Sequence, residues 1–457
     1  MQQSWYWQSL PLESRTGAEV FAALFSKAKI STLLESPWPT KESRTPLARY
    51  SICAGSPRIV EGCMQMWTPP IGKIFAFLEQ LLHQASVAKN LNDYPNHLPF
   101  TGGWLGWLGY DVAWEIEKLP WLRADNLPFP VAFWYQPENF AVLDHYEQTI
   151  WLAAANIKQL NTLTNQLKSS PPLPIPFVSH TSPVSFLTSQ SDYEAAVRQA
   201  KKYIQAGDIF QTNLSVRFGT QTTNDSWEIY RSLQHINPSP FASYWRSPWG
   251  HIISCSPERL VQLSNGIAQT RPIAGTRSRG ATLEQDNDLA QELIASAKEK
   301  SEHIMLVDLE RNDLGRVCQW GSVQVDELLT IERYSHVMHL VSNVKGVLAP
   351  ALSPIELIRA MFPGGTISGC PKVRCMEIIE ELEPLRRNLF YGSCGYLDWR
   401  GNLDLNILIR TLLVTPRSTY SSVWGQVGAG IVADSDPKTE WYESLQKAQA
   451  QLAALRV

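Results

Sequence analysis

A proline-rich segment constrains the architecture of this 457-residue chain more than any other feature of its sequence. Prolines occupy positions 171, 172, 174 and 176. Proline lacks the N–H group that a helix interior or a central strand must donate, so residues 169–176 predict an irregular connection. We place a boundary just after it, which gives an N-terminal domain over 1–185 and a second domain over 186–457.

The pattern after the boundary predicts helices laid against paired strands. Ser191 and Glu194 have the S-x-x-E spacing of a capping box, apolar residues then recur at helical spacing, and Gly207 ends the run. Further helices are expected over 284–305, 371–382 and 437–455, and strands over 210–218, 259–263, 406–414 and 425–432. This arrangement predicts an α+β fold with large, mostly antiparallel sheets flanked by helices.

The segment 102–110 contains four glycines and admits two interpretations. It resembles a phosphate-binding loop in composition, but it lacks both the G-x-G-x-x-G order and the lysine of a P-loop. Close backbone packing within a sheet is the interpretation we favour.

Composition excludes several classes of protein. Forty Lys and Arg balance 43 Asp and Glu, a net charge of -3 that gives no basic surface for nucleic acid. We expect no transmembrane helix, because no apolar run reaches the required length of about 18 residues. Residues 1–7 show no leader pattern, so we expect a cytoplasmic protein. Seven scattered cysteines without a C-x-x-C pair indicate neither a disulfide framework nor a zinc site.

Two E-x-x-E pairs are the sharpest chemical signal. Glu299 and Glu302 lie three residues apart in one predicted helix, and Glu440 and Glu443 repeat the spacing in the last helix. Residues three apart share a helix face, so two such helices would present four carboxylates to one point, where Mg²⁺ would relieve their repulsion. The spacing alone favours the simpler interpretation, two solvated helix faces. Lys447 follows Glu443 by four residues, either as its ion pair or as an anion ligand.

Three other places offer polar groups to a ligand. Glu258 supplies a carboxyl group beside a predicted strand. Gly428, Ala429 and Gly430 let backbone N–H groups approach a carboxylate. Arg410 falls inside a predicted apolar strand, where a charge needs a partner such as a substrate carboxylate.

Taken together, these motifs resemble those of the chorismate-binding enzymes, specifically the large subunits of aminodeoxychorismate synthase and anthranilate synthase. The matching segments are 256–259, 271–276, 307–316, 362–374 and 428–435, with Glu443 and Lys447, and in the first half 33–36, 49–51 and 102–110. The match is dense over 190–457. So many motifs in one order make the solvated-face interpretation of the glutamates untenable.

The resemblance implies a role for each candidate residue. Glu302 and Glu443 correspond to Mg²⁺ ligands, with Glu299 and Glu440 behind them. The groups that match those around the substrate carboxylates are Tyr391, Arg410, Lys447, Gly275 and the backbone of Gly428, Ala429 and Gly430. Glu258 corresponds to the general acid that helps the 4-hydroxyl depart, and His339, Thr276 and Ala274 line the ring. Gln211 stands where the relatives that use water place a lysine base, which implies ammonia as the nucleophile.

The resemblance also implies ligands beyond the catalytic centre. Glu35, Ser36 and Pro238 lie in segments that match the tryptophan-binding element of the family, whether tryptophan inhibits or is only structural. No Cys–His–Glu machinery for glutamine hydrolysis is recognisable, so a separate glutaminase subunit is expected to deliver the ammonia.

The product is the point on which the sequence signals divide. Many aminodeoxychorismate synthases carry a lysine at the position of Ala274, whereas anthranilate synthases carry alanine. The segments 241–244 and 404–410 depart from the anthranilate pattern. We expect 4-amino-4-deoxychorismate, an intermediate of 4-aminobenzoate and folate synthesis. Anthranilate synthase is the alternative, and an inactive chorismate- or tryptophan-binding regulator is disfavoured because the acidic residues and Arg410 are all present.

Overall fold

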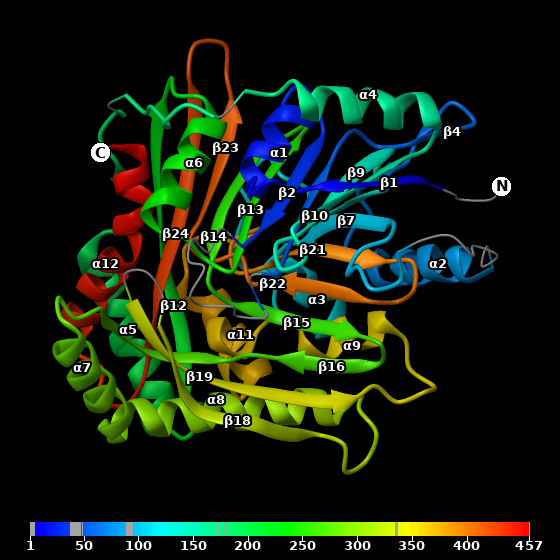
Figure 1. The fold of residues 1–457 in the computed structure, drawn as a ribbon. Helices are drawn as coiled ribbons and strands as arrows, with labels where there is room; N and C mark the ends of the chain where they lie inside the picture. The colour runs from blue at the N-terminus through cyan, green and yellow to red at the C-terminus, as the bar shows by residue number, and fades with distance from the viewer. Residues whose placement is uncertain are drawn as a thin grey trace.

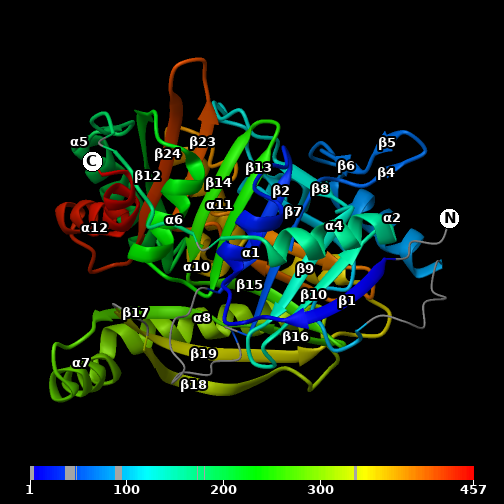
Figure 2. The same cartoon turned by 45° about the horizontal axis from the view of Figure 1, so that its top comes forward.

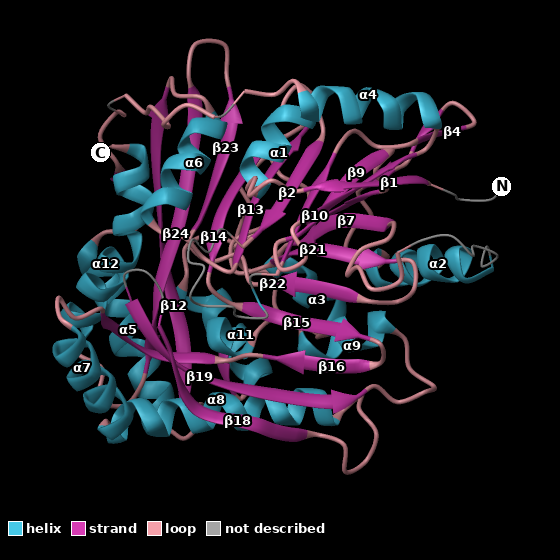
Figure 3. Ribbon diagram, viewed as in Figure 1, coloured by secondary structure: helices cyan, strands magenta, loops and turns pink. Residues whose placement is uncertain are grey.

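Two β-sheets form the body of the molecule (Figure 1), and within each sheet the neighbouring strands pair antiparallel. The computed structural model describes residues 5–36, 47, 49–87, 95–171, 173–179, 181–333 and 337–456. The expected α+β fold with large antiparallel sheets flanked by helices is confirmed, as Figure 3 shows in the strands gathered at the centre and the helices around them.

The larger sheet has twelve strands. In spatial order they are β1 (Tyr6–Pro11), β10 (Thr149–Ala154), β9 (Asn139–Asp144), β3 (Tyr50–Ala54), β2 (Ser31–Glu35), β13 (Phe241–Ser247), β14 (Gly250–Ser256), β23 (Thr411–Pro416), β24 (Ser421–Ile431), β12 (Gln211–Thr222) and β11 (Ser185–Phe186), with β20 (Gly369–Cys370) paired to β12. Its longest pairing joins β12 to β24, and this pair carries much of the candidate site.

The second sheet has ten strands. In spatial order they are β17 (Ile273–Ser278), β19 (Val337–Val347), β16 (Ile267–Thr270), β15 (Arg259–Ser264), β22 (Leu403–Asn406), β21 (Ser393–Asp398), β7 (Gly103–Leu108), β8 (Ala132–Tyr135) and β6 (Met66–Trp67), with β18 (Gln324–Arg333) paired to β19. A separate hairpin joins β4 (Ile59–Val60) to β5 (Cys63–Met64).

Helices cover the outer faces of both sheets. They are α1 (Gly17–Leu24), α2 (Ile74–Val87), α3 (Ala113–Ile116), α4 (Ile157–Lys168), α5 (Gln190–Gln205), α6 (Ser226–Ile236), α7 (Leu283–Ala295), α8 (Ala297–Gly315), α9 (Pro354–Met361), α10 (Gly365–Ser368), α11 (Lys372–Leu382) and α12 (Pro437–Leu455). α8 runs along the edge formed by β17, β19 and β18 (Figure 2), while α12 packs on β24 between α5 and α6. No helix in the described ranges is long and apolar enough to cross a membrane.

Buried apolar side chains form two main clusters. One lies between the sheets and includes Trp107, Phe133 and Phe390. The other lies between the larger sheet and the helices α1, α4, α6 and α12, and includes Phe21 and Tyr230. Large aromatic side chains dominate both clusters, as expected from the area that each one buries.

Each sheet combines a block of neighbouring strands from the first half of the chain with a block from the second half. β2 pairs with β13, and β7 pairs with β21, so the stretches 1–185 and 186–457 share hydrogen-bonded ladders. The boundary itself stays a prediction. The described residues from 169 to 184 form no helix or strand, as the prolines require, and residue 172 lies outside the described residues.

Three local predictions are corrected by the structure. Ser189, not Ser191, caps α5, because its hydroxyl accepts from the Asp192 N–H at 3.2 Å. The helix expected over 284–305 is two helices that meet at Ser296, which caps α8. The strand expected over 406–414 is interrupted between β22 and β23, and Arg410 lies in this break with a φ of 52°.

The glycine-dense segment forms β7, a strand whose residues are all buried. A Cβ atom on Gly106 would lie 2.2 Å from the Phe133 carbonyl oxygen and 2.4 Å from the Trp134 ring. Glycine is therefore required for close approach of β7 to β8, which agrees with the packing interpretation.

Gly106→Ala should lower the free energy of unfolding by about 3 kcal/mol, because the contacting carbonyl belongs to a central strand that cannot shift freely. The measurement is the urea midpoint followed by tryptophan fluorescence. Gly315→Ala is the matched control, because no atom lies within 4 Å of its added Cβ. An unchanged midpoint for Gly106→Ala would show that the sheet adapts.

Candidate active site

Glu258 is a buried carboxylic acid between β14 and β15. The Thr366 hydroxyl donates to its Oε1 at 2.7 Å, and the Ile407 N–H donates to its backbone carbonyl at 3.0 Å. Burial raises the pKa of Glu258 to about 7, and the Thr366 hydrogen bond opposes part of this rise. The group is thus able to carry a proton at neutral pH and to donate it.

His339 and Thr276 face each other across the β17–β19 pair. The Thr276 hydroxyl and His339 Nδ1 are 2.9 Å apart. Burial and, to a smaller extent, the nearby positive charge of Arg410 lower the pKa of His339 to about 4, so the imidazole is neutral at physiological pH.

A bulge in β17 separates Ala274 from Thr276 and is formed by Gly275, which has a φ of 66°. A Cβ atom on Gly275 would come within 3.0 Å of Glu299 Oε2, so the strand passes directly beneath the start of α8. Ala274 itself is buried, with a side chain too small to reach far into the site.

Arg410 and Tyr391 both occupy left-handed backbone positions, with φ values of 52° and 63°. Residues other than glycine adopt this conformation at a cost, and such strain gathers where a side chain must be aimed. Burial is the main cause that lowers the pKa of Arg410, and Arg410 in turn acts on the pKa of Tyr391 as well as that of His339. The three side chains therefore lie within electrostatic range of one another.

Strand β24 forms one wall of the site. A Cβ atom on Gly428 would lie 2.9 Å from the Tyr391 hydroxyl, and one on Gly430 would lie 2.4 Å from Gln211 Nε2 and 3.6 Å from Glu302 Oε1. Lys447 Nζ donates to the Gly428 carbonyl at 3.1 Å, and the Arg410 guanidinium donates to the Lys447 carbonyl. With no side chain of their own, the two glycines let Tyr391, Gln211 and Glu302 approach the backbone of β24 closely.

Ala429, between the two glycines, turns its methyl group the other way. It is fully buried in the cluster that contains Tyr193 and Trp441. Of this residue only the backbone is available on the site wall.

The four glutamates differ in their surroundings. Glu302 accepts from Gln211 Nε2 at 3.1 Å, Glu299 contacts Arg277 at 3.4 Å, and Glu443 pairs with Lys447 at 2.8 Å while 46% of its side chain stays exposed. Glu440 is buried. Within the ranges that the structure describes, no group of three or more His, Cys, Asp and Glu residues is arranged to hold a metal ion.

Electrostatics connect the two glutamate pairs. The pKa of Glu302 is raised chiefly by burial and then by the charge of Glu299. The pKa of Glu440 is likewise raised chiefly by burial, and the charge of Glu443 adds to this rise. Lys298 and Lys447 lower the pKa of both Glu302 and Glu440. The carboxylates of α8 and α12 thus lie within range of the same two cations.

Several buried polar atoms around β24 lack a hydrogen-bond partner. They are Gln211 Oε1, Asn213 Oδ1, the Tyr391 hydroxyl and Glu440 Oε2. Folded proteins pair nearly all such groups, so a cluster of atoms without partners among the described residues, beside the two glycines of β24, indicates a binding site for a polar ligand.

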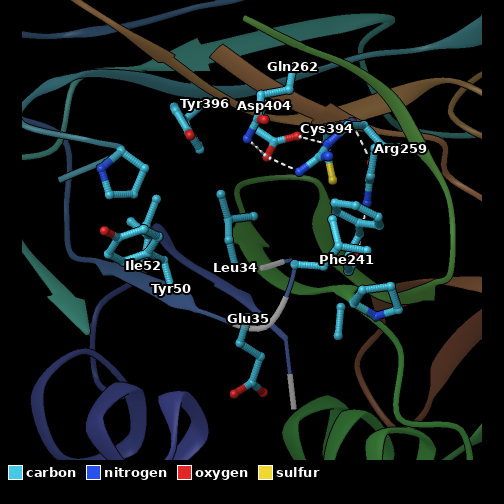
Figure 4. Close-up of a pocket in the computed structure, with 16 residues that line it drawn as sticks. Leu34, Glu35, Tyr50, Ile52, Phe241, Arg259, Gln262, Cys394, Tyr396 and Asp404 are labelled. Atoms are coloured by element: carbon cyan, nitrogen blue, oxygen red, sulfur yellow. Dashed lines mark hydrogen bonds and ion pairs between the residues drawn. The ribbon is translucent and has the colours of Figure 1, made fainter. Parts of the chain in front are cut away.

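A cavity of about 120 Å³ lies between the two sheets (Figure 4). Its walls come from β2, β3 and β13 on one side and from β15, β21 and β22 on the other. Arg259 makes a two-pronged ion pair with Asp404, with both N–O distances 2.9 Å, and its guanidinium lies over the Phe241 ring. The cavity combines apolar walls with charged groups at one end.

The residues expected to bind tryptophan are only partly at this cavity. Glu35 lines it, but its carboxylate turns away from Arg259 and Asp404 (Figure 4) and accepts from Tyr230 and Gln234, each at 2.6 Å. Ser36 and Pro238 are not among the lining residues.

Sequence reasoning missed Thr366, the partner of Glu258. Thr366 stands inside the segment 362–374 that carried the resemblance, so the motif was visible but its contact was not. It also missed Asn213 and Lys298, which no motif singled out.

Comparison with known proteins agrees with this geometry. Residues 50–453 match the family described as chorismate binding enzyme. The chain is 61% identical to the anthranilate synthase component I-like protein of Synechocystis, over 99% of this chain and 92% of that protein. It is 41% identical to aminodeoxychorismate synthase component 1 of Bacillus subtilis, over 98% and 97%.

Two anthranilate synthases extend the comparison. Anthranilate synthase component 1 of Synechocystis is 41% identical over 79% of this chain and 78% of that protein. The crystal structure of anthranilate synthase component I from Streptococcus pneumoniae superposes with a TM-score of 0.75, at 33% identity, and covers 90% of this chain and 94% of that chain.

Proposed function

The chain belongs to the chorismate-binding enzymes, and from this premise we propose that it aminates chorismate with ammonia in the presence of Mg²⁺. The proposed product is 4-amino-4-deoxychorismate, released with its enolpyruvyl group still attached. A separate glutaminase subunit is the proposed source of ammonia.

The combination of Glu258 with Gln211 carries this proposal. Glu258 holds a proton near neutral pH and can give it to the departing 4-hydroxyl, which leaves as water. Gln211 is a neutral amide that donates to Glu302, so it cannot take a proton from an attacking water molecule. Ammonia attacks without prior deprotonation and needs no such base.

The positively charged side chains of the site suit a substrate with two carboxylates. Arg410, Lys447 and the unpaired Tyr391 hydroxyl converge beside Gly428. A guanidinium or ammonium group in a buried site binds a carboxylate strongly. These residues would orient the ring so that its 4-hydroxyl faces Glu258.

The donor set beside them fits Mg²⁺ in its chemistry. Glu302 and Glu443 would hold the ion, with Glu299 and Glu440 behind them, and all four offer the oxygen ligands that Mg²⁺ prefers. The partly buried Glu302 and the buried Glu440 have raised pKa values, and Glu440 Oε2 has no hydrogen-bond partner among the described residues, as expected of carboxylates that hold a cation. When bound, the ion would supply positive charge for a substrate carboxylate.

The choice of product rests on the relatives. The chain aligns with the Bacillus subtilis aminodeoxychorismate synthase over nearly the full length of both. Synechocystis has both an anthranilate synthase component 1 and the separate anthranilate synthase component I-like protein, and this chain is more similar to the latter. That similarity supports a chorismate aminase distinct from the tryptophan-pathway enzyme.

Ala274 supports anthranilate synthase as a second candidate. Its small buried side chain offers no amine to capture the ring at C2, which leaves that carbon open to ammonia itself. Amination at C2 with loss of pyruvate is therefore the alternative outcome of the product test.

We predict that the purified chain, given chorismate, Mg²⁺ and an ammonium salt, forms a product that yields 4-aminobenzoate only after a lyase is added. Glutamine alone should not replace the ammonium salt. Mass spectrometry and pyruvate release follow the reaction. Pyruvate formed in step with chorismate loss, without lyase, would assign anthranilate instead, and turnover with glutamine alone would exclude the need for a partner.

Glu302→Gln and Glu443→Gln should each lower the rate by at least about 100-fold, because either change removes a charged ligand from the ion. Mg²⁺ should raise the Tm of the parent and leave that of the variants unchanged. Glu13→Gln is the control, since Glu13 is an exposed carboxylate in the N-terminal half whose ion-pair partner is Arg15. Parent-like activity in either ligand variant would remove it from the metal site.

The cavity between the sheets is the proposed site for tryptophan. L-tryptophan should bind with measurable heat in calorimetry, and Leu34→Trp should abolish the binding by filling the cavity, which Leu34 lines from the inter-sheet side of β2 (Figure 4). Protein denatured and refolded beforehand serves as the ligand-free starting material. Equal binding by parent and variant would place tryptophan elsewhere, and no binding to the refolded parent would remove this ligand from the proposal.

A further inference from the structure

Two amide oxygens on strand β12 are buried without a hydrogen-bond donor. They are Gln211 Oε1 and Asn213 Oδ1, and neither has a partner among the described residues. Side chains two residues apart in a strand point to the same face of the sheet, so the two amides lie side by side on one face of β12. A pair of neighbouring acceptors therefore awaits a ligand that can donate.

The two glycines of β24 place these amides on the wall of the site. Asn213 pairs with Gly430 across the β12–β24 ladder. A Cβ atom on Gly430 would lie 2.4 Å from Gln211 Nε2, and one on Gly428 would lie 2.9 Å from both Asn213 Oδ1 and the Tyr391 hydroxyl oxygen. Each amide thus occupies the space that a larger residue of β24 would fill, and Asn213 lies beside the same glycine as Tyr391.

Neighbouring contacts hold both amides in place. Gln211 Nε2 donates to Glu302 Oε1 at 3.1 Å, so the nitrogen of this amide faces the proposed metal ligand and its oxygen faces away. The Arg387 guanidinium donates to the backbone carbonyl of Asn213 at 2.7 Å and fixes the strand at the second amide. A buried acceptor without a donor costs free energy, which a bound donor would recover.

Chorismate cannot supply the donors for both oxygens. Its two carboxylates only accept hydrogen bonds, and its single hydroxyl group is the 4-hydroxyl, which faces Glu258 in the proposed reaction. Ammonia, the other reactant, carries three N–H groups and one lone pair. It can donate to both amide oxygens and still direct its lone pair at the ring.

We propose that Gln211 Oε1 and Asn213 Oδ1 form the binding site for the attacking ammonia. This site rests on the proposed amination of chorismate and gives the position of its nucleophile. Two N–H groups donate to the amides, and the nitrogen lone pair forms the new C–N bond as the C4–O bond breaks. Glu258 gives its proton to the departing hydroxyl, which leaves as water, and the ammonium group formed on the ring releases one proton in return. Water in the same place would meet two neutral amides and no base.

Asn213 is the residue to change, because Gln211 also contacts Glu302. Asn213→Leu keeps a side chain of similar size and removes the acceptor. The KM for free ammonia should rise about tenfold, which corresponds to the loss of one hydrogen bond. The KM for chorismate and the kcat at saturating ammonia should stay within about twofold of the parent values, because only the binding of the nucleophile is weakened.

Two further variants and a second measurement complete the test. Asn213→Ala removes the acceptor with a smaller side chain, should leucine not fit. Gln221→Leu is the matched control, because it replaces an exposed amide on the same strand. Each protein is assayed with Mg²⁺ and saturating chorismate at one pH while free ammonia is varied. Calorimetry with Mg²⁺ and chorismate, without ammonia, measures the affinity for chorismate independently.

The expected result is a weaker response to ammonia in both variants at position 213, with unchanged affinity for chorismate and a control that matches the parent. A parent that does not consume chorismate with an ammonium salt would overturn the proposed function. An active parent whose variants keep its KM for free ammonia would overturn the ammonia site alone. Variants that lose chorismate binding together with their response to ammonia would also overturn it, because Asn213 would then serve the fold or the chorismate site.

Discussion

A buried ion pair between Arg387 and Glu383 holds the candidate site together. Arg387 is 1% exposed and meets Glu383 with N–O distances of 2.6 and 2.9 Å. The same guanidinium donates to the Ile367 carbonyl of α10 and to the Asn213 carbonyl of β12, and it lies 4.5 Å from the centre of the Tyr391 ring. Glu383 in turn accepts from the N–H and hydroxyl of Ser215. Its carboxylate and the guanidinium are thus fully hydrogen-bonded, which offsets the cost of removing both charges from water.

This ion pair therefore connects elements that are far apart in the sequence. Thr366 precedes Ile367, and Asn213 pairs with Gly430 across the β12–β24 ladder, so the pair fixes the acid side and the glycine wall of the site relative to each other. Removing one partner of a buried pair costs about 3–5 kcal/mol, because the other charge is left unpaired. The polar atoms around β24, by contrast, have no hydrogen-bond partners among the described residues. The surrounding ion pair, and not these atoms, therefore holds the site in one arrangement.

Burial then sets the protonation states that the chemistry needs. Glu258 is driven toward the protonated form, and His339 toward the neutral imidazole, both chiefly because charge is disfavoured in the dry interior. Arg410 remains the cation at the centre of this region, beside a neutral His339 and the Tyr391 hydroxyl. A substrate with two negative charges would meet an acid that already carries its proton, and an Arg410 side chain that is not yet paired with a carboxylate.

Sequence patterns were sufficient where a local rule decides the structure. Helical spacing located α5, α11 and α12, and the glycine-dense segment was correctly interpreted as packed strand, because periodicity and steric space are local properties. The patterns failed where distant contacts decide. Arg410 was placed within a strand, whereas its contact with α12 and its neighbours around the site hold it in a left-handed bend. Neither Arg387 nor the contact of Thr366 with Glu258 could be predicted, since their partners are brought together only by the completed sheets.

The start of β15 separates two different environments. Glu258 accepts from Thr366 on one side, and the next residue, Arg259, lines the cavity between the sheets, where it pairs with Asp404, which also accepts from Gln262. Successive residues of an extended chain point to opposite sides, so one peptide bond separates the two environments. The register of β15 against β22 shifts directly after Arg259, which makes this strand end the least regular part of its ladder.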